Sequence, residues 1–287
     1  MNDRLQRARQ ILSTPLRNWL TRAYAAGPEL SDAVQMCRRF SQQGVGGDIC
    51  YWAGDDDTPR YVADAYLAAI RTMARERLDC TISIKAMVLG FSRNLVAEVV
   101  GMGKAAGIGI YFDSRAFELA DQVLELVTES AQHNPQIGCA IPGRWQRSLH
   151  DADQAAALGV NVRVVKGEWA DPDHPNIDLR EGFLAVVDRL AGRARHVAVA
   201  THDPSLAREA LRRLVDAGTP CELELLFGLP MRAVTQAARD LGARTRVYIP
   251  YGHSWVPYAL SWAMKNPRVF WWIFTDAVFG RRSCFLK

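Results

Sequence analysis

Charged side chains lie inside or directly after short apolar runs in this sequence. The clearest example is the run at residues 162–169, where β-branched residues surround Arg163 and lead into Lys166, Gly167 and Glu168. Burying a charge among apolar side chains costs free energy unless the charge is paired or serves a ligand. We therefore expect this run to carry ligand binding or acid–base chemistry.

The same arrangement recurs at the ends of other apolar runs. The residues at those ends include Trp52, Lys85, Asp113, Arg144, Thr201, His202, Glu224 and Tyr248. Together, Lys85, Arg163 and Lys166 predict a cationic mouth that suits an anionic or electron-accepting cofactor.

Neither His202 nor Asp113 stands in an HxH or HExxH spacing, so no metal site is predicted. A Ser/His/Asp triad has no support either, because the sequence has no GxSxG motif.

Eight apolar runs have the character of strands, and a helical pattern follows each of them. The runs are at residues 48–54, 80–85, 108–113, 136–141, 162–169, 196–201, 221–226 and 245–250. Strict alternation of strand and helix implies a parallel sheet with right-handed crossovers. Eight such units in about 220 residues have the size of a closed (β/α)8 barrel, whose active residues lie at the carboxyl ends of the strands. An open doubly wound sheet would need GxGxxG after the first strand, where the sequence has none.

The sequence therefore predicts an α/β fold, a (β/α)8 barrel with an N-terminal helical extension. Residues 1–43 are expected to form the extension, and residues 44–287 the barrel with a C-terminal helical tail. A chain of 287 residues with 49% hydrophobic content is long enough for one such barrel.

Composition argues against several other classes of protein. The net charge of +4 is small and scattered, without the dense basic stripe of a nucleic-acid-binding surface. Six cysteines without CxxC spacing indicate free thiols in a reducing compartment. No run of about 18 uncharged apolar residues predicts a spanning helix, and the charged N-terminus lacks the apolar core of a signal peptide. We therefore expect a cytoplasmic protein.

Four stretches in the last four predicted strands are similar to consecutive signatures of the proline dehydrogenase family. They are Arg163-Val-Val-Lys-Gly-Glu-Trp169, Ala200-Thr-His-Asp-Pro204, Glu222-Leu-Glu-Leu-Leu-Phe-Gly228 and Arg246-Val-Tyr-Ile-Pro-Tyr-Gly252. In addition, Lys85 and Asp113 fall where that family has a lysine and an aspartate. The resemblance covers about residues 44–267. It implies a distorted (β/α)8 barrel with FAD across the carboxyl face of the strands.

The resemblance also implies roles for individual residues. Positions on the catalytic face are Lys85, Asp113, Arg163 and Tyr248. Cofactor contacts are Arg163, Val165, Lys166, Gly167, Thr201, His202 and Glu224. Substrate contacts are expected from Glu168, Tyr258, Ser261 and Trp262. In the family, the arginine matched by Arg163 lies near the reactive flavin nitrogen, where positive charge favours the anionic reduced ring.

Several positions depart from the family pattern. On the substrate side, Ser261 and Trp262 stand where the family has two adjacent arginines that grip a carboxylate, and Lys265 replaces a glutamate. Serine and tryptophan cannot copy the bidentate grip of arginine. The other departures are Pro142 and Glu224, each in place of a glutamine, and Glu168 in place of an alanine.

These departures lead us to expect an FAD-dependent oxidoreductase that oxidises a C–N bond of an amine or amino-acid-derived substrate, and not free L-proline. Two alternatives remain open. One is a catalytically inactive barrel, flavin-binding or empty, with a structural or regulatory role. The other is a true proline dehydrogenase whose carboxylate grip has moved, for example to Lys85 with Arg144. The sequence does not identify the electron acceptor, although relatives that reduce quinone make a quinone one candidate.

The C-terminal tail predicts at most a peripheral membrane contact, at the inner face. Its apolar residues are Phe270, Trp271, Trp272, Ile273, Phe274, Val278 and Phe279, and Arg281 and Arg282 follow them. Aromatic residues beside basic ones suit an interfacial helix, while a helix packed on the barrel is the alternative.

In liposome flotation, the full-length protein should float and a variant truncated after residue 268 should not. Equal and negligible flotation of both proteins would contradict a membrane contact.

Overall fold

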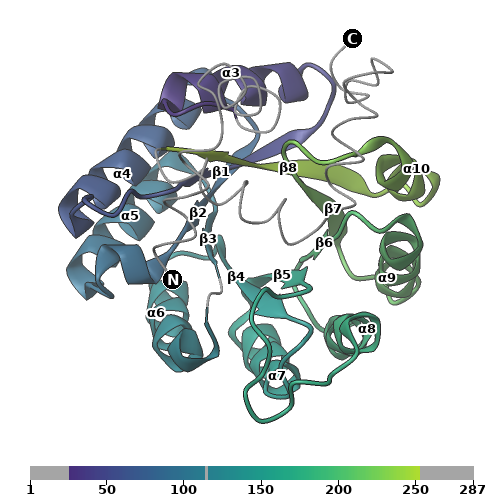
Figure 1. The fold of residues 1–287 in the computed structure, drawn as a ribbon. Helices are drawn as coiled ribbons and strands as arrows, with labels where there is room; N and C mark the ends of the chain where they lie inside the picture. Colours follow the sequence, from purple (N-terminus) through teal and green to yellow (C-terminus); the bar gives the residue numbers. More distant parts are fainter. Residues whose placement is uncertain (1–25, 114–115, 253–287) are drawn as a thin grey trace, which may run out of the picture.

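A closed barrel of eight parallel strands forms the centre of the protein (Figure 1). The computed structural model describes residues 26–113 and 116–252. Within them the strands are β1 (Gly46–Tyr51), β2 (Cys80–Ile84), β3 (Ile110–Phe112), β4 (Ile137–Pro142), β5 (Asn161–Val165), β6 (Val197–Ala200), β7 (Cys221–Leu226) and β8 (Arg244–Tyr251). Each strand pairs in parallel with the next one in sequence, and β8 pairs with β1. The predicted (β/α)8 barrel is thereby confirmed, with each strand close to its predicted position.

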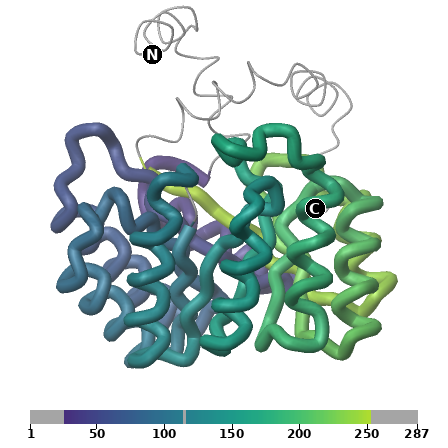
Figure 2. Tube along the Cα trace, turned by 90° about the horizontal axis from the view of Figure 1, so that it is seen from below, coloured from purple at the N-terminus to yellow at the C-terminus, as the bar shows by residue number. Residues whose placement is uncertain are grey.

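Helices surround the barrel and run alongside the strands (Figure 2). They are α3 (Leu30–Ser41), α4 (Pro59–Glu76), α5 (Arg93–Ala106), α6 (Ala120–His133), α7 (Ser148–Leu158), α8 (Leu179–Leu190), α9 (Pro204–Asp216) and α10 (Arg232–Asp240), with short 3-10 helices η1 (Ala86–Leu89) and η2 (Phe117–Leu119). Thr58 accepts a hydrogen bond from the Tyr61 amide at the start of α4. In the same way, the Asp203 carboxylate accepts from two amides of the first turn of α9. These caps fix where the loops after β1 and β6 end.

Helix α3 covers the outer side of β1 and β8 (Figure 1). Its buried face includes Val34, Cys37 and Phe40, and the Phe40 ring meets the ring of Phe227 edge-on at 6.1 Å. The part of the N-terminal extension that the structure describes therefore packs as a member of the helical ring. The domain boundary at residue 43 stays a prediction, because the chain before residue 26 lies outside the described residues.

The inside of the barrel combines large polar side chains with very small ones. Ala140 and Ala198 are the register neighbours of Arg163 on β4 and β6, so they share its inward-facing side. A Cβ on Gly138 would overlap the ring of Tyr111. Small residues on β4 and β6 thus leave room for long polar side chains to reach across the barrel.

The outward-facing residues of the strands are apolar and form the core between the sheet and the helices. Those with no exposed surface include Ile82, Ile84, Ile110, Val162, Val164, Val197, Val199, Leu223, Val247 and Ile249. The alternation along each strand therefore separates two tasks. Outward positions hold the helices, and inward positions carry the polar groups of the site.

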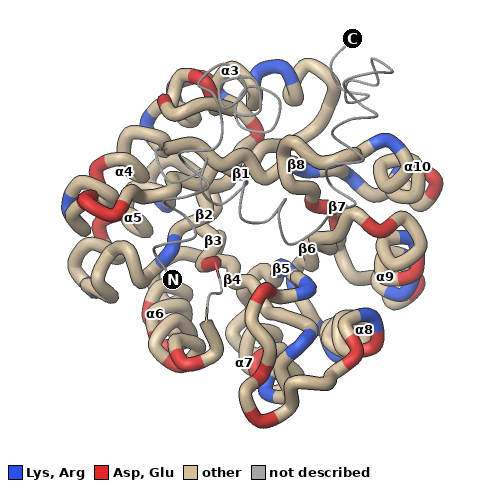
Figure 3. Tube along the Cα trace, viewed as in Figure 1, with Lys and Arg blue, Asp and Glu red and all other residues tan. Residues whose placement is uncertain are grey.

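The helices carry acidic and basic residues interspersed over the outer surface (Figure 3). Many of these residues form ion pairs, such as Arg38 with Glu76 and Arg189 with Asp153. No helix within residues 26–113 and 116–252 is long and apolar enough to cross a membrane. The cysteines of this part of the chain are free thiols, namely Cys37, Cys50, Cys80, Cys139 and Cys221.

Replacing Gly182 by alanine should destabilise the protein, although alanine is the better helix former. Gly182 lies near the start of α8, where a Cβ would overlap the carbonyl oxygen of Gly143 and lie 2.9 Å from Ile177. Overpacking of this kind costs about 1–3 kcal/mol. Gly101 in α5 is the matched control, because nothing lies within 4 Å of a Cβ there. Gly101→Ala should raise the free energy of unfolding by about 1 kcal/mol, because alanine has the higher helix propensity. Urea unfolding of both variants checks these predictions. Equal unfolding midpoints for the two variants would contradict the close approach of Gly182 to Gly143.

Candidate active site

A cavity of about 280 Å³ opens at the carboxyl ends of the strands. The described residues that line it are Trp52, Lys85, Asp113, Ala140, Pro142, Arg163, Val165, Gly167, Glu168, Trp169, Ala200, Thr201, His202, Glu224, Leu225, Leu226 and Tyr248. This is the face at which (β/α)8 barrels carry their active sites. Among the described residues with a predicted catalytic, cofactor or substrate role, only Lys166 is not part of this lining, and the strand-end residue Arg144 also lies outside it.

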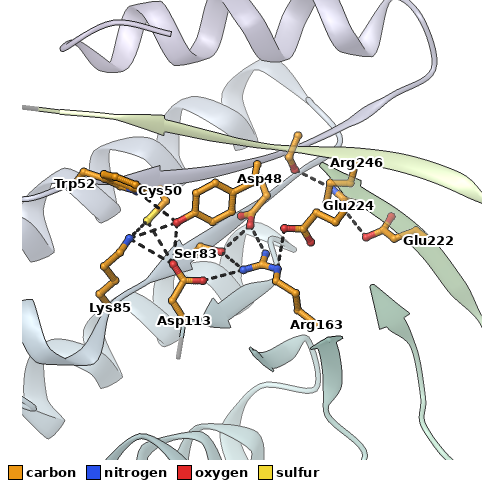
Figure 4. A network of polar contacts seen from close by, with 12 residues as sticks. Asp48, Cys50, Trp52, Ser83, Lys85, Asp113, Arg163, Glu222, Glu224 and Arg246 are labelled. Atoms are coloured by element: carbon orange, nitrogen blue, oxygen red, sulfur yellow. Dashed lines mark hydrogen bonds and ion pairs between the residues drawn. The ribbon is translucent and has the colours of Figure 1, made fainter. Parts of the chain in front are cut away.

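Arg163 lies at the centre of a polar network that reaches this cavity (Figure 4). Its side chain is only 3% exposed. Nη1 donates to Asp113 at 2.8 Å and to Ser83 at 2.9 Å, and Nη2 donates to Asp48. Nε lies 2.7 Å from Oε1 of Glu224, in an ion pair that lacks the alignment of a hydrogen bond. Three carboxylates, from β1, the end of β3 and β7, thus surround one guanidinium.

Lys85, at the end of β2, forms the second part of the network. Its Nζ lies 2.7 Å from the sulfur of Cys50 and 3.4 Å from the carboxylate of Asp113. The same ammonium lies 3.3 Å from the hydroxyl of Tyr248, which donates a hydrogen bond to Asp113 at 2.8 Å. It also lies 5.1 Å from the centre of the Trp52 ring. Asp113 therefore joins this lysine to the central arginine.

The expected cationic mouth of Lys85, Arg163 and Lys166 is wrong, because Lys85 and Arg163 are paired with carboxylates and Lys166 is not part of the described lining. Lys85 and Arg163 share Asp113. Arg144 is a further cation that the sequence places at this face. It donates to the main-chain carbonyl of Glu168 at 2.9 Å and is not among the described lining residues. The sequence shows the cations at the strand ends, but not the acidic partners that the barrel brings beside them.

Sequence reasoning did not identify Asp48, Glu222 or Arg246 as parts of this network. Asp48 is completely buried on β1 and accepts a hydrogen bond from Arg163. Glu222 accepts from Nε of Arg246 at 2.7 Å, one layer further from the cavity. The available signal was charge inside predicted strands, including two glutamates, Glu222 and Glu224, on the same side of the seventh. Such residues need partners across the barrel.

Burial shifts the pKa values of several groups in the network. It raises the pKa of Glu224 to about 8, although the charge of Arg163 acts in the opposite direction. Burial also raises the pKa of Asp48, again opposed by Arg163. The pKa of Tyr248 lies well above its ordinary value because of burial and the nearby charge of Asp113. The network therefore contains groups that hold their protons at neutral pH.

His202 is held by main-chain groups at and after the end of β7. Its Nε2 accepts a hydrogen bond from the Leu226 amide at 2.9 Å, so Nδ1 carries the proton and donates to the Pro230 carbonyl at 3.0 Å. Burial lowers the pKa of this imidazole, which agrees with a neutral ring. Both nitrogens are occupied, so His202 shapes the wall of the cavity beside the buried Thr201.

The loop after β5 is fixed against the loop after β4. Gly167 has a positive φ of 86°, and a Cβ there would lie 2.8 Å from Pro142. The indole of Trp145 donates to the carbonyl of Trp169 at 2.9 Å. These contacts hold the main chain of residues 165–169, most of which lines the cavity.

The structure describes only one of the predicted substrate contacts, Glu168, which is exposed. Tyr258, Ser261 and Trp262 lie outside the described residues, as do Lys265 and the C-terminal tail. Their roles stay predictions.

Comparison with known proteins finds relatives of this chain. No family model matches the chain. Proline dehydrogenase 1 of Bacillus subtilis is 25% identical over 264 residues, which are 86% of each chain. Proline dehydrogenase of Deinococcus radiodurans is 25% identical over 273 residues, 87% of each chain. The chain resembles proline dehydrogenases over most of its length. The resemblance predicted from the strand motifs is therefore confirmed.

Solved structures share the fold. Proline utilization A from Bdellovibrio bacteriovorus, inactivated by N-propargylglycine, superposes with a TM-score of 0.73 at 14% identity and covers 83% of this chain. Proline utilization A from Corynebacterium freiburgense superposes with a TM-score of 0.70 at 16% identity and covers 98% of this chain. This chain spans only 31% and 34% of those longer proteins. At such identities the likeness establishes the fold alone.

Asp48→Asn should lower the free energy of unfolding by about 1–3 kcal/mol, the range for hydrogen bonds to charged groups. The substitution keeps the shape of the side chain but removes the buried charge that faces Arg163. Asp64→Asn is the control, because it removes a partner of Arg60 on the exposed surface and should leave the urea midpoint unchanged. Equal midpoints for wild type and both variants would contradict a stabilising role for the buried pair.

Proposed function

We propose that the protein is an FAD-dependent oxidoreductase that oxidises a C–N bond in an amine or amino-acid-derived substrate. The observation that carries this proposal is the network of Lys85, Asp113, Arg163 and Tyr248 at the carboxyl face of the barrel. These four residues come from different strands, and the family motifs implied them together. An inactive scaffold would gain little stability from burying such charges beside an open cavity.

The residues around the cavity fit a flavin in chemical terms. A ligand of this kind needs a few placed polar partners and apolar walls. Oε2 of Glu224 offers a polar atom without a hydrogen-bond partner within residues 26–113 and 116–252, and Arg163 contributes its charge. Thr201, Val165 and Gly167 would hold the ring from the walls. When bound, FAD supplies the acceptor for the hydride that leaves the substrate carbon.

The network can also manage the proton that leaves the substrate nitrogen. Asp113 is the most exposed of the carboxylates around Arg163, with 14% of its side chain exposed. Its two oxygens are held by Arg163 and by the Tyr248 hydroxyl, each at 2.8 Å. We assign proton acceptance and substrate orientation to Asp113. Tyr248 and Lys85 keep its carboxylate in place.

The charges that line the cavity favour a substrate without a free carboxylate. Among the described lining residues, the cations are Lys85 and Arg163, and the acidic residues are Asp113, Glu168 and Glu224. Both cations are already paired. A carboxylate that entered would lose its hydration without meeting an unpaired cation among these residues. An amide is uncharged, and a protonated amine can pair with the carboxylates of the lining.

The same contacts weaken the case for a relocated carboxylate grip. In one form of that alternative, Lys85 and Arg144 bind one anion. Lys85 is paired with Asp113, and Arg144 donates to the carbonyls of Gly167 and Glu168 at 3.4 Å and 2.9 Å. The described contacts therefore favour an altered substrate over a moved grip.

The cellular location and the electron acceptor are also part of the proposal, and both are inferred from the sequence. We infer a cytoplasmic protein with at most a peripheral membrane contact. A quinone is the first electron acceptor to test, because the resemblance to proline dehydrogenases makes it a candidate.

Free L-proline should be a poor substrate. Losing a charged partner for a buried carboxylate costs about 2–5 kcal/mol, which is roughly 30- to several-thousand-fold in binding. Protein loaded with FAD is mixed anaerobically with L-proline, L-prolinamide or other cyclic amines, and the loss of flavin absorbance is followed. The amide and the amines should bleach the flavin faster than proline does. Rapid bleaching by millimolar proline would contradict the proposal that the substrate is not free proline. Protein that takes up no FAD would contradict the proposal that FAD is the cofactor.

Asp113→Asn is the matched variant for this experiment. It should keep the yellow colour of bound FAD, since the side chain keeps its shape. It should reduce the bleaching rate by about 10²- to 10⁴-fold for every substrate, the usual contribution of a positioned acid or base. Wild-type protein that binds FAD but is bleached by no amine would favour the inactive barrel.

A further inference from the structure

Among the described residues, the cluster around Arg163 holds one carboxylate more than its cations can pair. Arg163 contacts Asp48, Asp113 and Glu224. Lys85 adds a second contact to Asp113. Among the described residues of this cluster, two cations therefore face three carboxyl groups. A buried excess charge is costly, so such a cluster holds a proton instead.

The hydrogen bonds identify Glu224 as the group that holds this proton. Asp48 accepts hydrogen bonds from Arg163 and from the hydroxyl of Ser83, the latter at 2.6 Å. Asp113 accepts from Arg163 and Tyr248. Within the part of the chain that the structure describes, Glu224 has only the poorly aligned contact with Nε of Arg163. A carboxylate with good donors stays ionised, so in this coupled cluster the proton costs least on Glu224.

The position of that proton is Oε2 of Glu224. Oε1 faces the Nε of Arg163 at 2.7 Å and acts as an acceptor. Oε2 is buried and has no hydrogen-bond partner among the residues that the structure describes. A neutral carboxyl group therefore places an O–H donor there without an acceptor. Because Glu224 lines the cavity together with Ala200 and Leu226, a ligand in the cavity can supply one.

We propose that Glu224 is a neutral carboxylic acid that donates a hydrogen bond from Oε2 to an acceptor atom of the cofactor ring. The inference rests on the proposed function for the identity of that ligand. The glutamine that the family pattern has at this position is a donor at every pH. Glutamic acid is a donor only while it is protonated, so FAD binding should depend on pH in this protein.

Groups from several neighbouring elements set the proton affinity of Glu224. They are Asp48 on β1, Tyr111 on β3, Asp113 after β3, Arg163 on β5, His202 after β6, Glu222 on β7, and Arg246 and Tyr248 on β8. Burial raises the pKa of Glu224 to about 8, Arg163 opposes this, and Asp48 and Glu222 add to it. His202 is neutral, and Arg246 is bound to Glu222. The proton is therefore present at neutral pH and leaves as the pH rises through about 8.

FAD titrations between about pH 6 and pH 9, on either side of this pKa, test the proposal. Full-length protein stripped of FAD is compared with Glu224→Gln and Glu224→Ala, and affinity is measured by quenching of flavin fluorescence. Wild-type affinity should be constant at low pH and fall by about tenfold per pH unit above about pH 8. Glu224→Gln should match the low-pH wild type and show no fall. Glu224→Ala should bind weakly at every pH.

A matched control separates this effect from general changes with pH. Glu118→Gln removes an exposed carboxylate on η2 and should keep the complete wild-type profile, including the fall. A flat wild-type profile, or a glutamine variant as weak as the alanine variant, would overturn the proposal, because a merely structural role predicts no such pattern.

A second measurement detects the proton without FAD. The infrared band of a neutral carboxylic acid should be present in cofactor-free wild type at neutral pH and lost in Glu224→Gln. Its absence from wild type would overturn the neutral acid. If the band is present but wild type binds no FAD at any pH, the proposed cofactor fails and the donor role fails with it, while the assignment of the proton is supported.

Discussion

A buried guanidinium is the constraint on which the rest of the structure depends. Arg163 crosses the inside of the barrel with almost no contact with solvent, so its charge and its donors must be satisfied by protein groups. Asp48 and Asp113 accept its hydrogen bonds, and Glu224 adds a third carboxylate beside its charge. The space for this arrangement exists because register neighbours such as Ala198 are small. The packing of the barrel interior and the chemistry of the site are therefore the same set of contacts.

Pairing changes what Arg163 can do for a ligand. All three of its nitrogens face protein oxygens, so it acts through the charge of the whole cluster. A bare guanidinium would strongly favour an electron-rich reduced ring, and a paired one does so less. The proton of Glu224 enters the same balance. With the proton present, Lys85 and Arg163 face two ionised carboxylates, and without it they face three.

Most of the fold could be predicted because its signals are local. Apolar runs ended by glycine or proline mark the strands, and their alternation with helices gives the barrel. Membership of the site was also predictable, since strand ends such as Lys85 and Asp113 meet at one face. The pairing was not, because Asp48 and Arg163 lie 115 residues apart and only their depth in the barrel brings them together. The prediction of a cationic mouth was wrong for that reason, because local patterns show which residues are charged but not which of them form ion pairs.

The two glutamates of β7 show how depth in the barrel decides the state of a side chain. Glu222 and Glu224 face the same side of one strand, yet Glu222 has a cation of its own. The register places Glu224 beside Arg246 on β8. Arg246 nevertheless directs its donors to Glu222 and to the carbonyl of Gly47, at 2.7 Å and 2.8 Å, in the layer further from the cavity (Figure 4). As far as the structure describes the chain, the layer beside the cavity is therefore one cation short, and Glu224 must share Arg163 or hold a proton.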